Sequence, residues 1–191
     1  MKKIIYTLLM TASFTNLCFS QETEFKFVKE GFTDYIVTNC EGKTQSDLYK
    51  KTLDWISTTY KNPKEVIKAQ IENDYIRIEG FKSNMLCIKP LGILNCSDVR
   101  YQIEISFKDG RYKFDVTRVE EYSSPSKYSS GGWSDFPING DIGKAYFKES
   151  GEIRSIFKLY PEALQSTFNG LNKDLENFLK SEAIPSKKGN W

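Results

Sequence analysis

The residues that carry out chemistry in most enzymes are sparse in this sequence. None of the 191 residues is a histidine. Because histidine is the usual general base and the commonest metal ligand, Ser-His-Asp and Cys-His catalysis are excluded. The sequence also lacks a Cys-x-x-Cys pair, a phosphate-binding Gly-x-x-x-x-Gly-Lys loop and a Gly-x-Ser-x-Gly elbow. We therefore assign no catalytic residue, no metal ligand and no cofactor.

One pair of carboxylates offers an alternative chemistry. Asp135 and Asp141 lie close to Trp133, whose ring could stack on a sugar. A carboxylate-based glycan hydrolase needs two such groups about 5–10 Å apart in a cleft. The competing interpretation is that both are solvated turn residues, because aspartate beside glycine and proline is common in turns.

Two aromatic residues, Trp133 and Phe136, are the candidate ligand-binding residues. They lie in a segment rich in Ser, Gly and Pro, residues 120–141, which is expected to form a long loop. Exposed aromatic rings on a loop held by a scaffold are good contact points for a partner or an apolar ligand. The alternative is that both rings fold back over an open sheet edge as part of the core.

The first twenty residues predict a cleaved signal peptide. Lys2 and Lys3 precede a short apolar run at 4–10, and Ser20 is a small residue directly before Gln21. The run is too short to span a bilayer, so no transmembrane segment is expected after cleavage. We predict an exported protein, periplasmic or extracellular.

Three cysteines remain after that cleavage: Cys40, Cys87 and Cys96. The segment between the last two contains Pro90 and Gly92, which mark a turn, so a disulfide between Cys87 and Cys96 is possible. Three buried free thiols are the alternative. An unpaired Cys40 leaves a free thiol or a bond to another chain.

The rest of the chain is predicted to form one domain, residues 21–184, followed by a disordered tail at 185–191. The 27 Lys and Arg, less Lys2 and Lys3 of the signal peptide, equal the 25 Asp and Glu in number. A surface that tracks phosphates needs an excess of positive charge, so nucleic acid is not an expected partner.

Hydrophobic periodicity predicts the first elements of this domain. The pattern indicates a strand at 33–39, a helix at 44–60 and strands at 67–71 and 76–79, with an additional short strand possible at 84–89.

The clearest pattern follows at 99–117. Two alternating runs flank Asp109-Gly110, which predicts a two-residue hairpin turn that places Phe107 opposite Tyr112 and Ile105 opposite Phe114. A last helix begins near Pro161 and runs to about Lys180, with an apolar stripe formed by Leu164, Phe168, Leu171, Leu175 and Phe178. The order β-α-β-β-β-β-α predicts an α+β fold with both helices on one face of an antiparallel sheet and a charged, solvated second face.

Four segments carry a resemblance to a known family: residues 51–56, 60–67, 71–80 and 107–112. Together they resemble DUF4468, a family of exported bacterial domains of unknown function described as having a TATA-binding-protein-like (TBP-like) fold. The resemblance covers roughly residues 30–180 and implies a curved antiparallel sheet. It implies no activity and no site residues, and the fold alone does not imply DNA binding.

The function expected from the sequence is a non-enzymatic binding or interaction module of the bacterial cell envelope. Its partner would be an envelope protein or a small apolar ligand. The alternatives are the carboxylate-based glycan hydrolase and a structural envelope protein that pairs with another chain through Cys40.

Overall fold

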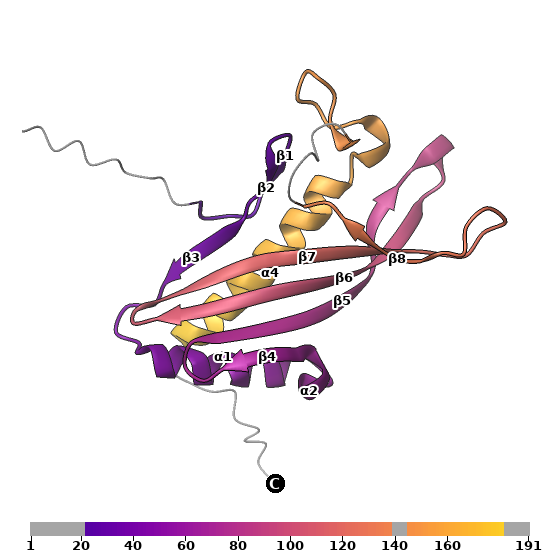
Figure 1. Ribbon diagram of the computed structural model, residues 1–191. Coiled ribbons are helices and arrows are strands. Elements are labelled where there is room, and N and C mark those ends of the chain that lie inside the picture. Colours follow the sequence, from indigo (N-terminus) through magenta and orange to yellow (C-terminus); the bar gives the residue numbers. More distant parts are fainter. Residues whose placement is uncertain (1–21, 139–144, 182–191) are drawn as a thin grey trace, which may run out of the picture.

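The computed structural model describes residues 22–138 and 145–181 (Figure 1). The predicted signal peptide at 1–20, the predicted tail at 185–191 and Asp141 lie outside these residues.

An open antiparallel sheet forms the body of the protein, with the strand order β3-β7-β6-β5-β4. β8 pairs with the far end of β7, beside β3, so β3 and β8 share one edge of the sheet. A separate hairpin of β1 and β2 precedes it. The strands are β1 (Phe27–Val28), β2 (Gly31–Phe32), β3 (Tyr35–Asn39), β4 (Ile67–Ile71), β5 (Tyr75–Ile88), β6 (Asn95–Lys108), β7 (Arg111–Ser123) and β8 (Gly132–Phe136).

Two long helices, α1 (Gln45–Thr59) and α4 (Tyr160–Lys180), pack on one face of this sheet (Figure 1). Thr44 caps α1 in a capping box with Asp47, and a proline occupies the first turn of α4. The short helical segments are α2 (Pro63–Val66), η1 (Pro90–Gly92) and η2 (Ser155–Phe157). The predicted α+β class, with a sheet covered by two helices on one face, is confirmed. None of the described helices is both long and apolar enough to cross a membrane.

The core lies between the helices and the sheet because alternate residues of β5, β6 and β7 point toward the helices. At its centre the fully buried ring of Phe168 on α4 packs edge-on against Phe25, Phe32 and Tyr101, with centroids 5.5–6.2 Å apart. These edge-to-face contacts add to the burial of apolar area, which is the main stabilising term.

The predicted hairpin at Asp109-Gly110 is confirmed. β6 and β7 pair with Phe107 opposite Tyr112 and Ile105 opposite Phe114, and all four side chains are buried.

The predicted loop at 120–141 is wrong as one continuous loop. β7 continues to Ser123, and after residues 124–131 β8 returns beside it, pairing Tyr122 with Trp133 and Val119 with Phe136. The serines and glycines of this segment weaken the strand pattern: Trp133, Ser134 and Asp135 are all exposed, and only Phe136 of this strand is buried.

The strands predicted at 76–79 and 84–89 are one strand, β5. It is interrupted by an irregularity between Lys82 and Leu86, where Asn84 adopts a positive φ of 51° and its backbone N–H donates to the Asp98 carboxylate at 2.9 Å. Such a bulge bends a strand without ending it.

The end of the β5–β6 hairpin beyond the bulge, residues 86–97, is called the distal arm. It carries a disulfide between Cys87 and Cys96, which lie opposite each other in the two strands. We expect the double variant Cys87→Ser, Cys96→Ser to lower the free energy of unfolding by about 2–3 kcal/mol, because the bridge restricts the unfolded chain. Urea unfolding of the oxidised protein and the variant measures this difference. Reducing agent should leave the variant unchanged, and an unaltered midpoint in the variant would contradict the prediction.

Candidate functional site

Four strands bring a group of aromatic and charged side chains together on the helix-free face of the sheet. The pairing register aligns Phe81 of β5 with Arg100 of β6, Arg100 with Glu120 of β7, and Glu120 with Asp135 of β8. The pair of Tyr122 with Trp133 flanks this row on one side and Arg118 flanks it on the other, and we call the whole group the Trp133 cluster. Its members are Phe81, Arg100, Arg118, Glu120, Tyr122, Trp133 and Asp135.

Trp133 is the centre of this cluster. Its side chain is 37% exposed, and three neighbours surround it. The Arg100 guanidinium carbon lies 4.8 Å from the indole centroid, while the rings of Phe81 and Tyr122 lie 6.2 and 5.3 Å away. A cation above the indole face, the edge-on ring of Phe81 and the tilted ring of Tyr122 hold the tryptophan in one orientation while leaving part of it open to solvent.

Glu120 organises the charges beneath the indole. Its carboxylate is buried, and it accepts from Arg100 Nε at 2.7 Å and pairs with Arg118 Nη2 at 3.2 Å. Arg118 Nε also donates to Asp135 Oδ1 at 2.8 Å. These hydrogen bonds raise the pKa of Arg100, chiefly through Glu120, and the pKa of Arg118, chiefly through Asp135. The result is a closed network in which each carboxylate is bound by a guanidinium.

A hollow of about 660 Å³ adjoins the cluster. One wall of this hollow is formed by residues 79–81 of β5, at the end of the stretch that pairs with β4. The other wall is formed by residues 60–66, which follow α1. Phe81 and Arg100 line both the hollow and the cluster, and Tyr60, Lys68 and Glu79 complete its polar rim. Lys68 and Glu79 form an ion pair at 3.3 Å. A ligand resting on Trp133 can therefore extend into this hollow.

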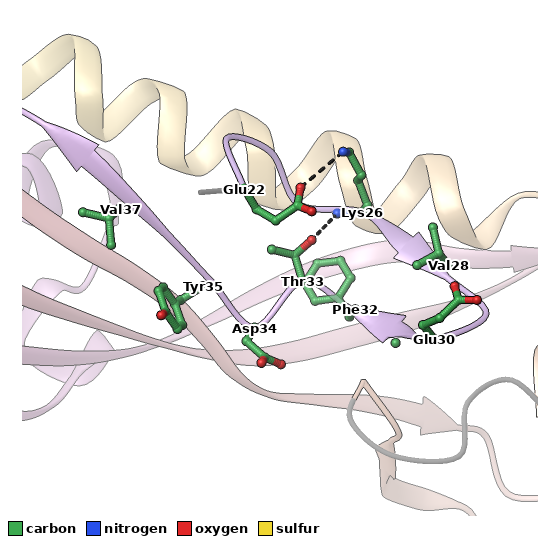
Figure 2. A pocket seen from close by; sticks show the side chains of 10 residues that line it. Glu22, Lys26, Val28, Glu30, Phe32, Thr33, Asp34, Tyr35 and Val37 are labelled. Atoms are coloured by element: carbon green, nitrogen blue, oxygen red, sulfur yellow. Dashed lines mark hydrogen bonds and ion pairs between the residues drawn. The ribbon is translucent and has the colours of Figure 1, made fainter. Parts of the chain in front are cut away.

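A second hollow, of about 710 Å³, lies along the β1–β2 hairpin and β3 (Figure 2). Figure 2 shows the ion pair of Glu22 with Lys26 on one side of Thr33 and the Asp34 carboxylate on the other. The Lys26 backbone N–H donates to the Thr33 hydroxyl at 3.0 Å. In this hollow Glu22 thus binds Lys26 and Thr33 binds the backbone, so these polar groups do not converge on a shared point, as they would in a built ligand site. The Trp133 cluster is the stronger candidate.

The structure separates the two aromatic candidates. Trp133 lies on the helix-free face, whereas Phe136 is 3% exposed and packs on the helix side against Phe27, Tyr146 and Tyr160. Phe136 therefore belongs to the core and is not available to a ligand.

The hydrolase pair is not brought together within the described residues. Asp135 is exposed and bound to Arg118, and Asp141 lies outside the described residues. Sequence reasoning missed Glu120, which stands directly opposite Asp135. Among residues 22–138 and 145–181, no three acidic or cysteine side chains form a group that could hold a metal ion.

Cys40, the proposed link to another chain, is buried at 2% exposure at the end of β3. Burial raises the pKa of its thiol, which lowers the fraction of reactive thiolate at neutral pH. A disulfide to a second chain would require this end of the sheet to open.

Comparison with known proteins agrees with this architecture. The model of a family described as "Domain of unknown function (DUF4468) with TBP-like fold" matches residues 35–122. Among solved structures, the chain is similar to a DUF4468 family protein from Bacteroides ovatus, with 12% identity and a TM-score of 0.53 over 82% of this chain and 91% of that one. It is also similar to a TBP-like protein from Parabacteroides distasonis, with 13% identity and a TM-score of 0.53 over 77% and 91% of the two chains.

No curated protein matches the chain. At these identities the solved structures show the fold alone. The matched residues 35–122 run from the start of β3 almost to the end of β7 and include α1. The four segments whose sequence resembles the family all lie within this range. Residues 35–122 therefore match the DUF4468 family model with its TBP-like fold, and the description of that family assigns no function.

Proposed function

We propose that the protein is a non-enzymatic binding module of the cell envelope and that the Trp133 cluster contacts a protein partner. The observation that carries this proposal is the half-open indole of Trp133, fixed by Arg100, Phe81 and Tyr122 on the sheet face opposite α1 and α4. An aromatic side chain already held in place loses little conformational entropy when a partner covers it.

The composition of the cluster favours a protein over a nucleic acid. Tryptophan, tyrosine and arginine are the residues that dominate binding energy at protein interfaces. The cations of this face are already paired with acids, as in Arg77 with Glu104 and Arg100 with Glu120. A phosphate backbone needs cations that are free to replace its counterions. The paired charges would instead supply a polar rim around the aromatic centre.

A carboxylate-based hydrolase is less well supported. Glu120 and Asp135 stand opposite each other beside an indole, but Arg118 contacts both of them. A general acid must be protonated when it acts, and a bound guanidinium favours the ionised form. The pair therefore serves to position arginines.

Export is part of the proposal. The signal-like residues 1–20 support it, and so does a disulfide on the distal arm, since such bonds persist in oxidising compartments. We expect mass spectrometry of protein from the native host to find an amino terminus at Gln21. A terminus at Met1 would contradict export by a cleaved signal.

The binding proposal is tested by native mass spectrometry on protein isolated gently from its own envelope without reduction. We expect a reproducible complex that Trp133→Ala weakens at least about tenfold, as loss of an interface hot spot does. The matched control is Tyr35→Ala, because Tyr35 is also exposed and stacks with a cation, Lys113 at 5.2 Å. A complex that survives Trp133→Ala, or a bare monomer even after cross-linking, would refute the proposal.

A further inference from the structure

Two hairpin turns project from the same end of the sheet. Residues 89–94 join β5 to β6, and residues 124–131 join β7 to β8. Because β5 and β7 both run antiparallel to β6, their turns lie at one end, and Figure 1 shows both hairpins extending beyond the sheet there. We call these two turns the tip pair.

The tip pair holds the most exposed large apolar side chains of the described residues. Leu91 is 101% exposed, Tyr128 91% and Ile93 71%. Leu94 of the same turn follows at 58%. Single exposed apolar residues are ordinary, but several on one projecting turn usually mark a contact with another apolar phase.

The first turn is built so that its apolar side chains cannot fold back. The Cys87–Cys96 disulfide joins the two strands just below it, and the Ile93 N–H donates to the Pro90 carbonyl at 3.0 Å across it. Leu91 has a φ of 49°, in the left-handed region that leucine rarely adopts. The backbone is thus held in a shape that presents this side chain outward.

Charge is distributed unevenly around the tip pair. The stretches 80–97 and 122–133 contain three lysines and no aspartate or glutamate. Lys82 donates to the Thr167 hydroxyl on α4 at 2.9 Å, which leaves Lys89 and Lys127 as the cations of the turns. The nearest acids along the chain are Asp98 and Glu121, and Asp98 accepts from the Asn84 N–H, so the turns themselves carry basic charge alone.

From these observations we propose that the tip pair docks on the surface of a lipid bilayer that contains anionic lipid. Leu91 and Ile93 enter the boundary between headgroups and acyl chains, and Lys89 and Lys127 face lipid phosphates. Tyr128 lies at the headgroup level, where amphipathic rings are favoured. An apolar groove on a protein would also accept Leu91 and Ile93, but it would not require the two turns to be free of acidic residues. An anionic lipid surface does require this, because acidic residues would be repelled from it. The Trp133 cluster lies on the sheet face near the base of these turns, so this contact uses other residues and goes beyond the function proposed above.

Vesicle co-sedimentation of the purified, disulfide-intact protein tests this inference. We expect binding to vesicles of phosphatidylethanolamine with phosphatidylglycerol, weakening as salt rises, and much less binding to phosphatidylcholine alone. The double variant Leu91→Ser, Ile93→Ser should bind at least about tenfold more weakly, since inserted methylenes supply the affinity. The double variant Lys89→Glu, Lys127→Glu should lose the preference for phosphatidylglycerol.

The matched control is Ile71→Ser. Ile71 is 59% exposed, but it lies at the β4–β5 turn at the opposite end of the sheet, so its loss should leave binding unchanged. Unaltered thermal unfolding of every variant would show that the fold is intact. Absence of wild-type binding at low salt, equal loss in Ile71→Ser, or full binding by the serine double variant would each overturn the proposal. The proposal would also be overturned if the wild type bound no vesicles but co-purified with another protein chain that the serine double variant no longer binds. That result would indicate a protein groove as the partner of the tip pair.

Discussion

Replacing Phe136 with alanine is expected to lower the free energy of unfolding by about 3–5 kcal/mol, the range for removing a buried phenylalanine ring. The ring is 3% exposed and lies 5.2 Å from the centroid of Tyr146 and 5.8 Å from that of Tyr160. Alanine would remove these contacts and leave a cavity where β8 meets the start of α4. The chain around it is close-packed and can fill such a gap only in part.

Trp133→Ala is the matched comparison, because it truncates a larger ring three residues earlier on the same strand. We expect a loss of only about 1 kcal/mol, since the indole is partly in water and its neighbours on the sheet remain paired. Urea unfolding of both variants, monitored by far-ultraviolet circular dichroism, measures the difference. Equal losses of unfolding free energy in the two variants would mean that Trp133 is a structural core residue, and the proposed interaction site would lose its main support.

The same two residues show what could be predicted from the sequence. Both were recognised as notable, but the serines and glycines around them indicated a loop. Once residues 132–136 are known to form a strand, the three-residue spacing places the two rings on opposite faces. The strand forms because β7 offers a free edge beyond the end of β3, and that edge is a tertiary feature which local composition does not contain.

The rest of the cluster could not be predicted for a related reason. Arg100 and Glu120 meet because β6 and β7 pair across a register shift between Gln102 and Ile103. The Asp-Gly turn fixes the register only near itself, and a single inserted residue changes every pair beyond it. The hairpin near the turn was therefore predicted correctly, whereas the pairs that build the Trp133 cluster lie past the bulge.

The hairpin of β1 and β2 shows the limit of pattern reasoning at short lengths. Two-residue strands carry no periodicity, yet Phe25 before β1 and Phe32 of β2 are buried and stacked with centroids 5.3 Å apart. The segment is fixed by α4 instead: the Asn169 amide oxygen accepts from the Phe25 N–H at 2.7 Å, and its nitrogen donates to the Phe25 carbonyl. Asparagine is a weak helix former, so the importance of Asn169 lies in this tertiary contact.

Gly80→Ala is expected to be the other strongly destabilising single substitution, at about 3 kcal/mol, the upper part of the usual range for overpacking a core. Gly80 lies in the middle of β5 opposite Tyr101, and a β-carbon there would overlap the end of the Tyr101 ring. That ring cannot move away easily. It is 4% exposed, packs on Phe168 at 5.5 Å, and its hydroxyl lies 3.5 Å from that of Tyr60. Glycine is therefore needed here because the tyrosine crosses over the strand.

Gly170→Ala provides a control of opposite sign. Gly170 lies within α4, and a β-carbon added there would meet no atom within 4 Å. Alanine favours the helix by about 0.5–1 kcal/mol over glycine, so this variant should be more stable than the wild type. Thermal and urea unfolding of the two variants should move in opposite directions. A tolerated Gly80→Ala would show that Tyr101 leaves its place readily, and the segment after α1, which contacts it through Tyr60, would then be a movable wall of the hollow beside Trp133.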